Sequence, residues 1–267
     1  MAFRPTLAWI DTFSLVALPL VAALLSLLLK PGYLLSVILF YGSPAVYLAL
    51  RFGRRARILK GLLFAVIVAV PFTIVVDYIG TTSGVWHVPA SVFPYRLLSV
   101  IPIEDFLWMV LATYTVVLMH ELLSGTDDHG LVNRRMEHFI LAASLGLNAF
   151  LILVASTDGA LFAWHSRYVY LALGSGFFLV PAVLFFWRFP EVLYRCMFTV
   201  AYFFFVTLIF EVTATSLKEW VFGGSYLLPP FTIFGVGSVP YEELFFVGII
   251  GPLAAIAFFE FFDDNLV

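Results

Sequence analysis

The chain has 267 residues, of which 63% are hydrophobic and 12% are charged, with a mean hydropathy of +1.04. Soluble domains contain roughly 45–50% apolar residues, so this composition excludes an ordinary soluble protein and predicts a polytopic membrane protein. The formal net charge is −3, and the basic residues fall in predicted loops, so we expect no nucleic-acid partner. The single cysteine, Cys196, excludes a disulfide framework and a cysteine-based metal site.

Apolar stretches of about 20 residues, the length that a helix needs to cross a bilayer, follow one another along the chain. They are predicted at residues 8–29, 33–51, 59–80, 101–122, 138–157, 168–188, 194–215 and 241–262. The first is longer than a signal-peptide core and is not followed by a cleavage pattern, so we expect it to be retained. The sequence therefore predicts an all-α, polytopic membrane helix bundle with eight transmembrane helices.

Lysine and arginine are distributed unevenly over the predicted loops. Of the 14 basic residues, ten fall on the side of the two termini, and five of these ten lie between Arg51 and Lys60. Positively charged loops remain on the cytoplasmic side. We therefore expect an integral protein of the cell membrane with both termini in the cytoplasm.

An internal repeat divides the chain into residues 1–125 and 126–267, each with four predicted helices. In both halves an acid near the end of the third helix is followed nine residues later by tryptophan and then by a Pro-x-Glu-acid motif that opens the fourth helix. Because four is an even number, both halves enter the membrane from the same side and form parallel repeats. The equivalent residues are Asp77, Trp86, Glu104 and Asp105 in the first half, and Glu211, Trp220, Glu242 and Glu243 in the second.

These acids are candidate functional groups, because an ionisable side chain inside a membrane is costly and usually serves a function. Consecutive residues on a helix point about 100° apart, so one acid of each pair is expected to face a pocket. We expect Glu104 and Glu242 to face inward together with Asp77 and Glu211, and Asp105 and Glu243 to support them. Crowded carboxyl groups share protons, so at least one is expected to stay protonated. The alternative is that the acids mark hydrated helix ends at the membrane interface.

Aromatic residues make up 18% of the chain and are candidates for lining a polyene slot and stabilising a carbocation. We select Trp86 and Trp220, and also Phe106 and Phe245, which follow the two acid pairs. Tryptophan is equally typical of the membrane interface, and phenylalanine of lipid-facing surfaces. The scattered histidines lack metal-site spacing, and no dinucleotide-binding loop follows a predicted strand, so we expect no metal and no cofactor.

These motifs resemble those of the integral-membrane lycopene cyclase domain family. The resemblance is carried by Asp77-Tyr78, Gly84-Val85-Trp86 and Pro102-Ile103-Glu104-Asp105-Phe106 in the first half, and by Pro240-Tyr241-Glu242-Glu243-Leu244-Phe245-Phe246 in the second. Because both halves are present, the chain resembles the fused, two-repeat form of the family. Glu211 stands where the first half has Asp77, which departs from strict symmetry.

The resemblance implies a lycopene beta-cyclase, an isomerase-type enzyme of carotenoid biosynthesis. It would turn the end groups of lycopene into beta-rings without a redox change, through gamma-carotene to beta-carotene. Its donor is expected to be Glu104 or Glu242, with Asp77, Glu211, Asp105 and Glu243 completing the catalytic set and Trp86, Trp220, Phe106 and Phe245 binding substrate. Lycopene or another acyclic carotenoid and the lipid bilayer are the implied partners, and association with other carotenoid-pathway enzymes is left open.

Three alternatives remain from the sequence. A cyclase that forms epsilon-rings or acts on C50 carotenoids would share the scaffold. A proton- or cation-coupled transporter would also use intramembrane acids in repeated halves, and it predicts helices broken at mid-membrane. A carotenoid-binding subunit without catalysis would keep its pigment when Glu104 or Glu242 becomes glutamine, whereas the cyclase interpretation predicts that either change lowers cyclisation.

Overall fold

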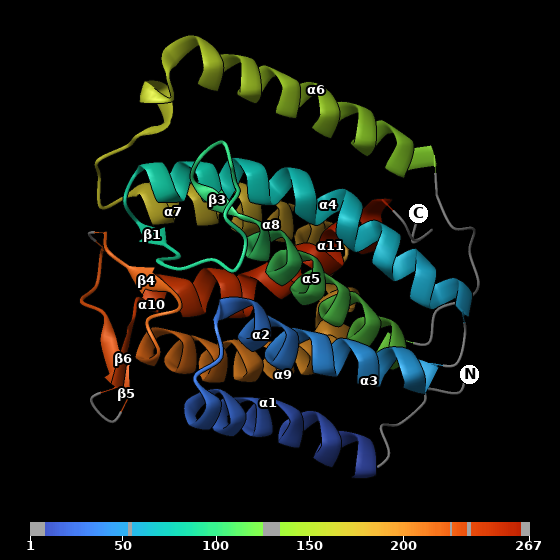
Figure 1. Cartoon of the computed structure of the whole chain (residues 1–267). Coiled ribbons are helices and arrows are strands. Elements are labelled where there is room, and N and C mark those ends of the chain that lie inside the picture. Colours follow the sequence, from blue (N-terminus) through green and yellow to red (C-terminus); the bar gives the residue numbers. More distant parts are fainter. Residues whose placement is uncertain (1–8, 53–54, 125–133, 225, 234–235, 263–267) are drawn as a thin grey trace.

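The computed structural model describes residues 9–52, 55–124, 134–224, 226–233 and 236–262 (Figure 1). Within them, eight helical spans are long and apolar enough to cross a membrane, which confirms the predicted bundle. Three spans contain a π-helical segment, labelled η1, η3 or η4. In chain order the spans are α1 (Trp9–Leu29); α2 (Tyr33–Val37) with η1 (Ile38–Gly42) and α3 (Ser43–Phe52); α4 (Arg55–Thr82); α5 (Ile103–Ser124); α6 (Arg134–Thr157); α7 (Val169–Gly174) with η3 (Ser175–Leu179) and α8 (Val180–Arg188); α9 (Pro190–Ser216); and α10 (Tyr241–Glu243) with η4 (Leu244–Ile250) and α11 (Gly251–Phe262).

The outer faces of these helices are apolar. Leu50, Trp187 and Tyr194, for example, are each more than three-quarters exposed. Helices are suited to hydrocarbon because they satisfy their backbone hydrogen bonds internally. The exposed apolar surface is therefore the surface expected to face lipid.

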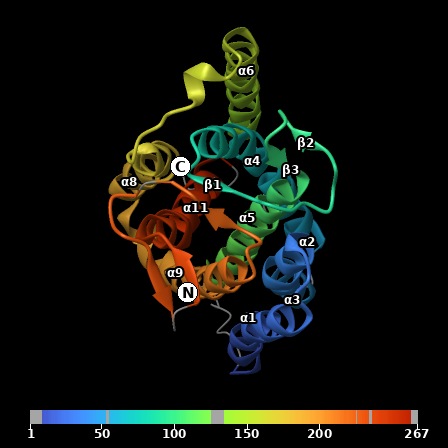
Figure 2. The same cartoon turned by 60° about the vertical axis from the view of Figure 1, so that its left-hand side comes forward.

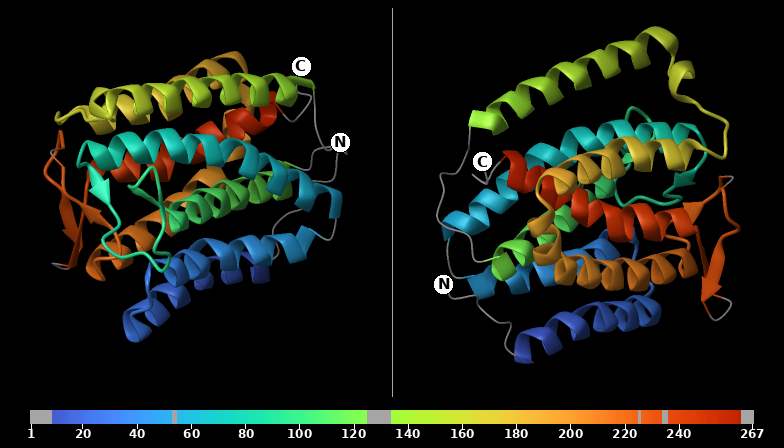
Figure 3. Two further views of the ribbon diagram at one scale, coloured as in Figure 1. Left: turned by 45° about the horizontal axis from the view of Figure 1, so that its top comes forward. Right: turned by 180° about the vertical axis from the view of Figure 1, so that it is seen from behind.

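The first helices of the two halves, α1 and α6, lie on opposite sides of the bundle (Figure 3). Each packs on the third helix of the other half: α1 contacts α9, and α6 contacts α4. This exchange ties the halves together. Of the two, α6 is the more loosely attached, since its buried residues are Met136, Phe150 and Val154 near its ends.

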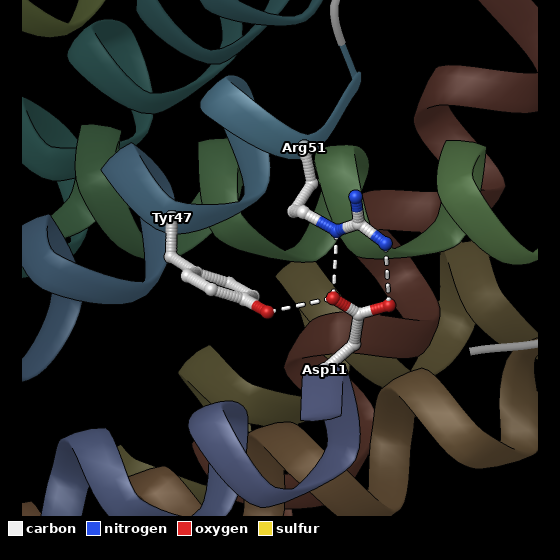
Figure 4. Close-up of polar contacts among 3 residues, drawn as sticks. All are labelled: Asp11, Tyr47 and Arg51. Carbon is white, nitrogen blue, oxygen red and sulfur yellow. Dashed lines mark hydrogen bonds and ion pairs between the residues drawn. The ribbon is translucent and has the colours of Figure 1, made fainter. Parts of the chain in front are cut away.

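A buried acid attaches α1 to the bundle (Figure 4). The Asp11 carboxylate accepts hydrogen bonds from Arg51 Nε at 2.6 Å and Nη2 at 2.8 Å, and from the Tyr47 hydroxyl at 2.7 Å. Both partners lie on α3. A two-pronged arginine–carboxylate contact is among the stronger polar interactions in proteins, so this cluster fixes the start of α1 against α3.

Short strands and their loops cover the opposite end of the bundle, and we call them the cap (Figure 2). Its strands form three antiparallel pairs: β1 (Trp86–His87) with β4 (Val221–Phe222), β2 (Arg96–Leu97) with β3 (Ile101–Pro102), and β5 (Phe231–Ile233) with β6 (Val236–Val239). The first pair joins the two halves, and His87 pairs with Val221. These residues each follow the repeat tryptophan of their own half, so the pairing has the symmetry of the repeat.

A second polar pair lies away from the cap, near the other ends of the two fourth helices. Nε2 of His120 on α5 forms a short hydrogen bond with Oε1 of Glu260 on α11. Both residues are at most 2% exposed. This contact links the fourth helices of the two halves, which run through the middle of the bundle (Figure 2).

Candidate active site

Four acidic side chains from both halves meet beneath the cap. Asp77 and Glu211 lie near the ends of α4 and α9, and Asp105 and Glu243 lie in the first turns of α5 and α10. Each is only 1–3% exposed. Asp77 is close enough to interact electrostatically with Asp105 and Glu243. Glu243 also interacts with Glu211, so the repeat places the four carboxyl groups in one acid centre.

Two tyrosines hold the acids that belong to the Pro-x-Glu-acid motifs. The Tyr33 residue, at the start of α2, lies beside Asp105 and interacts electrostatically with its carboxyl group. The Tyr170 hydroxyl, at the start of α7, donates a short hydrogen bond to Glu243. Neither tyrosine was predicted from the sequence to belong to the site. The two tyrosines occupy equivalent positions at the starts of the second helices of the two halves, and this repetition could have identified them.

The expectation that the first acid of each pair, Glu104 or Glu242, faces the pocket is wrong. Glu104 accepts hydrogen bonds from the Val92 amide at 2.6 Å and from the Ser91 hydroxyl at 2.7 and 2.9 Å. Glu242 accepts hydrogen bonds from the backbone amides of Leu227 at 2.6 Å and of the following residue at 3.4 Å. The first acid of each pair therefore binds the cap, because its loop supplies free amide donors that the sequence pattern did not reveal.

Two tryptophans lie above the acid centre. Trp86 and Trp220 are stacked, with ring centroids 6.5 Å apart and planes 16° apart. Both are about 95% buried. The Trp86 indole lies against Gly80, where an added Cβ would be 2.1 Å from the ring, so only glycine fits there. Trp86 Nε1 lies near Asp77 without hydrogen-bond geometry, and Asp77 Oδ2 has no hydrogen-bond partner among the described residues.

A cavity of about 30 Å³ opens between the tryptophans and the acids. Asp77 and Glu243 are the acids that line it, together with Trp86, Trp108 and Trp220. A second, almost entirely apolar cavity of about 60 Å³ continues from it toward the middle of the bundle. The two cavities share the lining residues Phe72, Trp108, Met109, Phe178 and Val247. Because they share these residues, we describe them as one slot, with the Asp77 and Glu243 carboxyl groups at the end beneath the tryptophans.

The two phenylalanines selected from the sequence lie elsewhere. Phe245 is 45% exposed, and Phe106 is partly buried, but neither is among the described residues that line the slot. The π-helical segment η4 directs Val247 into the slot and packs Phe246 on Tyr170. Periodicity of 3.6 residues does not anticipate a π-helical segment, and such segments are frequent at functional sites.

The model of the protein family described as lycopene cyclase matches residues 30–123 and 167–262, about seven tenths of the chain. The chain belongs to the lycopene cyclase family. It is therefore a carotenoid cyclase, and the eight apolar helical spans among its described residues agree with an integral membrane enzyme. No curated protein and no solved structure matched the chain.

The two matched regions of the cyclase show how its halves are built. Each region contains three spans, one tryptophan of the cap and one Pro-x-Glu-acid motif, whereas α1 and α6 lie outside. Three spans end on the side opposite to the one where they began, so α6 is needed to return the chain before the second region starts. Helix α6 thereby makes the two regions parallel, and both contribute acids to one centre.

The acid centre of the cyclase consists of carboxyl groups that are almost completely buried. Within the described part of the chain, no three histidine, cysteine, aspartate or glutamate side chains are grouped as ligands for a metal ion. Glu243 accepts a hydrogen bond from the Tyr170 hydroxyl, and the carboxyl groups interact electrostatically with one another. Such groups can donate a proton to a bound substrate and take one back.

Proposed function

We propose that this cyclase converts the acyclic end groups of lycopene into beta-rings, giving gamma-carotene and then beta-carotene. The observation that carries the proposal is the slot itself, in which Asp77 and Glu243 face an apolar channel beneath two stacked tryptophans. A hydrocarbon substrate offers no polar group for binding. The apolar walls therefore hold the chain, and the acids act on its end.

The first step is protonation of the terminal alkene at C2, which places a positive charge on C1. An alkene is a weak base, so its donor has to be an acid that is stable in its protonated form in a water-free site. We assign this role to Glu243, held by Tyr170, or to Asp77, whose Oδ2 is unpartnered among the described residues. Asp105 and Glu211 complete the proton network, and Glu104 and Glu242 hold the cap over it.

The following steps move the charge and return the proton. The C1–C6 bond forms and the cation moves to C5, and loss of the C6 proton to a carboxylate then leaves the C5–C6 double bond. The faces of Trp86, Trp108 and Trp220 stabilise the passing cation, since aromatic rings attract positive charge. The reaction is redox-neutral, and the carboxyl groups have the same total number of protons before and after it.

Substrate binding requires the slot to widen. Its cavities of about 30 and 60 Å³ are smaller than the roughly 300–1,000 Å³ of ordinary ligand sites. Phe72 closes the narrow part through ring contacts with Phe177 and Phe178, at centroid distances of 5.2 and 4.9 Å. We infer that these rings separate when a polyene enters from the bilayer, with the carotenoid chain then lying along the helices.

The cell membrane is the proposed location, with both termini in the cytoplasm and the cap on the opposite face. The proposed domains are the two halves, residues 1–125 and 126–267.

Ring type depends on the carboxylate that takes the final proton: removal from C6 gives a beta-ring, and removal from C4 gives an epsilon-ring. A transporter is disfavoured because each described span is a continuous helix, with π-helical segments in place of breaks.

Expression in cells that accumulate lycopene tests the proposal. We expect beta-carotene as the main product and gamma-carotene as an intermediate in pigment chromatograms. An epsilon-ring product would still agree with acid-initiated cyclisation, but it would mean that the carboxylate acting as the final base removes the proton from C4. Persistence of unchanged lycopene, with the protein present in the membrane fraction, would contradict the proposed activity.

A further inference from the structure

The surroundings of the acid centre differ between the two repeats. Tyr33 and Tyr170 occupy equivalent positions, but the residue one helical turn farther is Ser36 in the first half and Leu173 in the second. The residue before the repeat tryptophan is Val85 in the first half and Glu219 in the second. Because β1 and β4 pair across the halves, these differences combine at the same end of the bundle.

Glu219 and Ser36 form a polar contact outside the acid centre. The Ser36 hydroxyl donates a hydrogen bond to Glu219 Oε1 at 2.9 Å, and Ser26 Oγ on α1 lies 3.4 Å from Ser36 Oγ. Glu219 Oε2 is buried and has no hydrogen-bond partner among the described residues. The residue is 7% exposed, and its neighbour Lys218 is exposed, so the carboxyl group lies just below the surface.

This polar contact lies beside Tyr33 and Asp105, which we call the first-half branch of the acid centre. Ser36 is one turn from Tyr33 on α2, so the two side chains share a face. The Tyr33 ring lies 6.0 Å from that of Trp220, which directly follows Glu219, and Tyr33 interacts electrostatically with Asp105. Arg96 also interacts electrostatically with Asp105. Asp105 therefore has two polar neighbours, Tyr33 and Arg96, and Tyr33 lies one helical turn from the contact between Ser36 and Glu219.

The second-half branch, Tyr170 and Glu243, has more apolar surroundings. Around Tyr170 and Glu243, the positions equivalent to the serine and the outer acid are Leu173 and Val85, which are 4% and 3% exposed. Phe246 stacks on the Tyr170 ring at 6.1 Å. Tyr226 is a polar side chain on this side, with its ring 6.2 Å from that of Tyr170 and its hydroxyl donating a hydrogen bond to the Val85 carbonyl. No carboxyl group equivalent to Glu219 is found there among the described residues.

We propose that Glu219 is a proton-relay residue that lets the acid centre exchange protons with water through Tyr33 and Asp105. This inference rests on the proposed cyclisation and adds an asymmetry between the halves: Glu243 and Asp77 face the substrate, and Asp105 connects to the outside. Burial raises the pKa of the Glu219 carboxyl to about 7. A group with that pKa gains and loses protons readily near neutral pH.

The relay has a consequence that cyclisation alone does not have. Each ring takes one proton at C2 and releases one from C6, so an isolated acid centre could return the same proton to the next substrate. In heavy water, an isolated centre would recycle protium from the substrate. A centre connected to solvent would instead place deuterium at C2. The deuterium content of the product therefore measures exchange separately from the rate of ring formation.

The experiment compares wild type with Glu219→Gln in membranes supplied with lycopene in heavy water, and the product is analysed by mass spectrometry and NMR. We expect close to one deuterium per ring from wild type and a severalfold lower content from Glu219→Gln. Ser36→Ala, which keeps the carboxyl group, is expected to lower the content in the same direction. Glu191→Gln, a change in the exposed first turn of α9, is the matched control and should behave as wild type.

The outcomes separate the two proposals. Wild-type deuterium content in rings made by both Glu219→Gln and Ser36→Ala would overturn the relay and leave the cyclase proposal intact. The Ser36→Ala variant decides the question if Glu219→Gln fails to accumulate. Absence of any ring product from wild type would overturn the proposed function, and the relay with it.

Discussion

Trp86 and Trp220 hold equivalent positions in the two repeats and stack on each other with ring planes 16° apart. Each follows the third helix of its own half, and the adjoining strands β1 and β4 pair across the halves. The axis that relates the repeats therefore passes over the acid centre. Both halves contribute to the same pair of stacked tryptophans and to the same slot. This arrangement favours a single site that converts the two ends of lycopene one after the other.

The Gly80→Ala variant tests whether the position of the stacked tryptophans matters for the reaction. The added Cβ would lie 2.1 Å from the Trp86 ring, so the indole has to move off Trp220 and out of the slot. Misplacement of a positioning group by about 1 Å can cost on the order of a hundredfold in rate, and we expect a loss of that order in cyclisation. Pigment yield per amount of membrane protein measures it.

Gly146→Ala is the matched control for this change, because a Cβ at position 146 on α6 meets no atom within 4 Å. It should leave the pigment yield unchanged. Equal yields from Gly80→Ala and wild type would show that the stacked tryptophans are not needed for the reaction.

Tyr170→Phe is expected to lower cyclisation about tenfold to a hundredfold. The Tyr170 hydroxyl stabilises the carboxylate that Glu243 becomes when it donates its proton, and a hydrogen bond to a charged group contributes about 1.5–3 kcal/mol. Tyr33→Phe should affect the first-half branch instead, lowering deuterium uptake more than ring formation. If Tyr33→Phe mainly lowered ring formation and Tyr170→Phe mainly lowered deuterium uptake, the roles assigned to the two halves would be contradicted.

Asp11→Asn is expected to destabilise the protein without abolishing activity at low temperature. The change removes the charge that binds Arg51 and Tyr47, and the loss of stability is moderated because the Arg51 side chain is 51% exposed. Thermal unfolding in detergent should show a lower Tm. A Tm equal to that of wild type, with Glu137→Gln as the control on α6, would mean that packing alone holds α1.

The raised pKa of Glu219 predicts a pH dependence of stability. Between its ordinary pKa of 4.5 and the folded-state pKa of about 7, the folded protein binds more protons than the unfolded chain. Its free energy of unfolding therefore falls as pH rises through this window, by at most about 1.4 kcal/mol per pH unit. Glu219→Gln should remove this contribution. Identical Tm-against-pH curves for variant and wild type from pH 5 to 8 would contradict it.

The helical architecture could be predicted from the sequence because hydrocarbon imposes a simple rule. A run of about 20 apolar residues has one stable conformation in a bilayer, and the eight predicted spans agree with the structure to within a few residues. The cap could not be predicted in the same way. Strands as short as Trp86–His87 have no periodicity of their own, and they form because the matching strand of the other half lies opposite.

The acids could be located from the repeat, but their directions could not. Glu104 and Asp105 are adjacent in the first turn of α5, and each is a reasonable candidate for the pocket. The choice depends on the Val92 amide, twelve residues earlier in a loop, which binds Glu104. It also depends on Tyr33, at the start of a different helix. Neither contact has a signature in the local sequence.

The most direct test of the proposed centre compares the two neighbouring glutamates at the head of the last span. Glu243→Gln removes an acid that faces the slot and should lower beta-carotene formation about a hundredfold or more. Glu242→Gln keeps an oxygen for the Leu227 amide and should retain close to wild-type formation. Pigments from lycopene-accumulating cells, normalised to membrane protein, give both values. Loss of activity in Glu242→Gln with activity retained in Glu243→Gln would contradict the proposed acid centre.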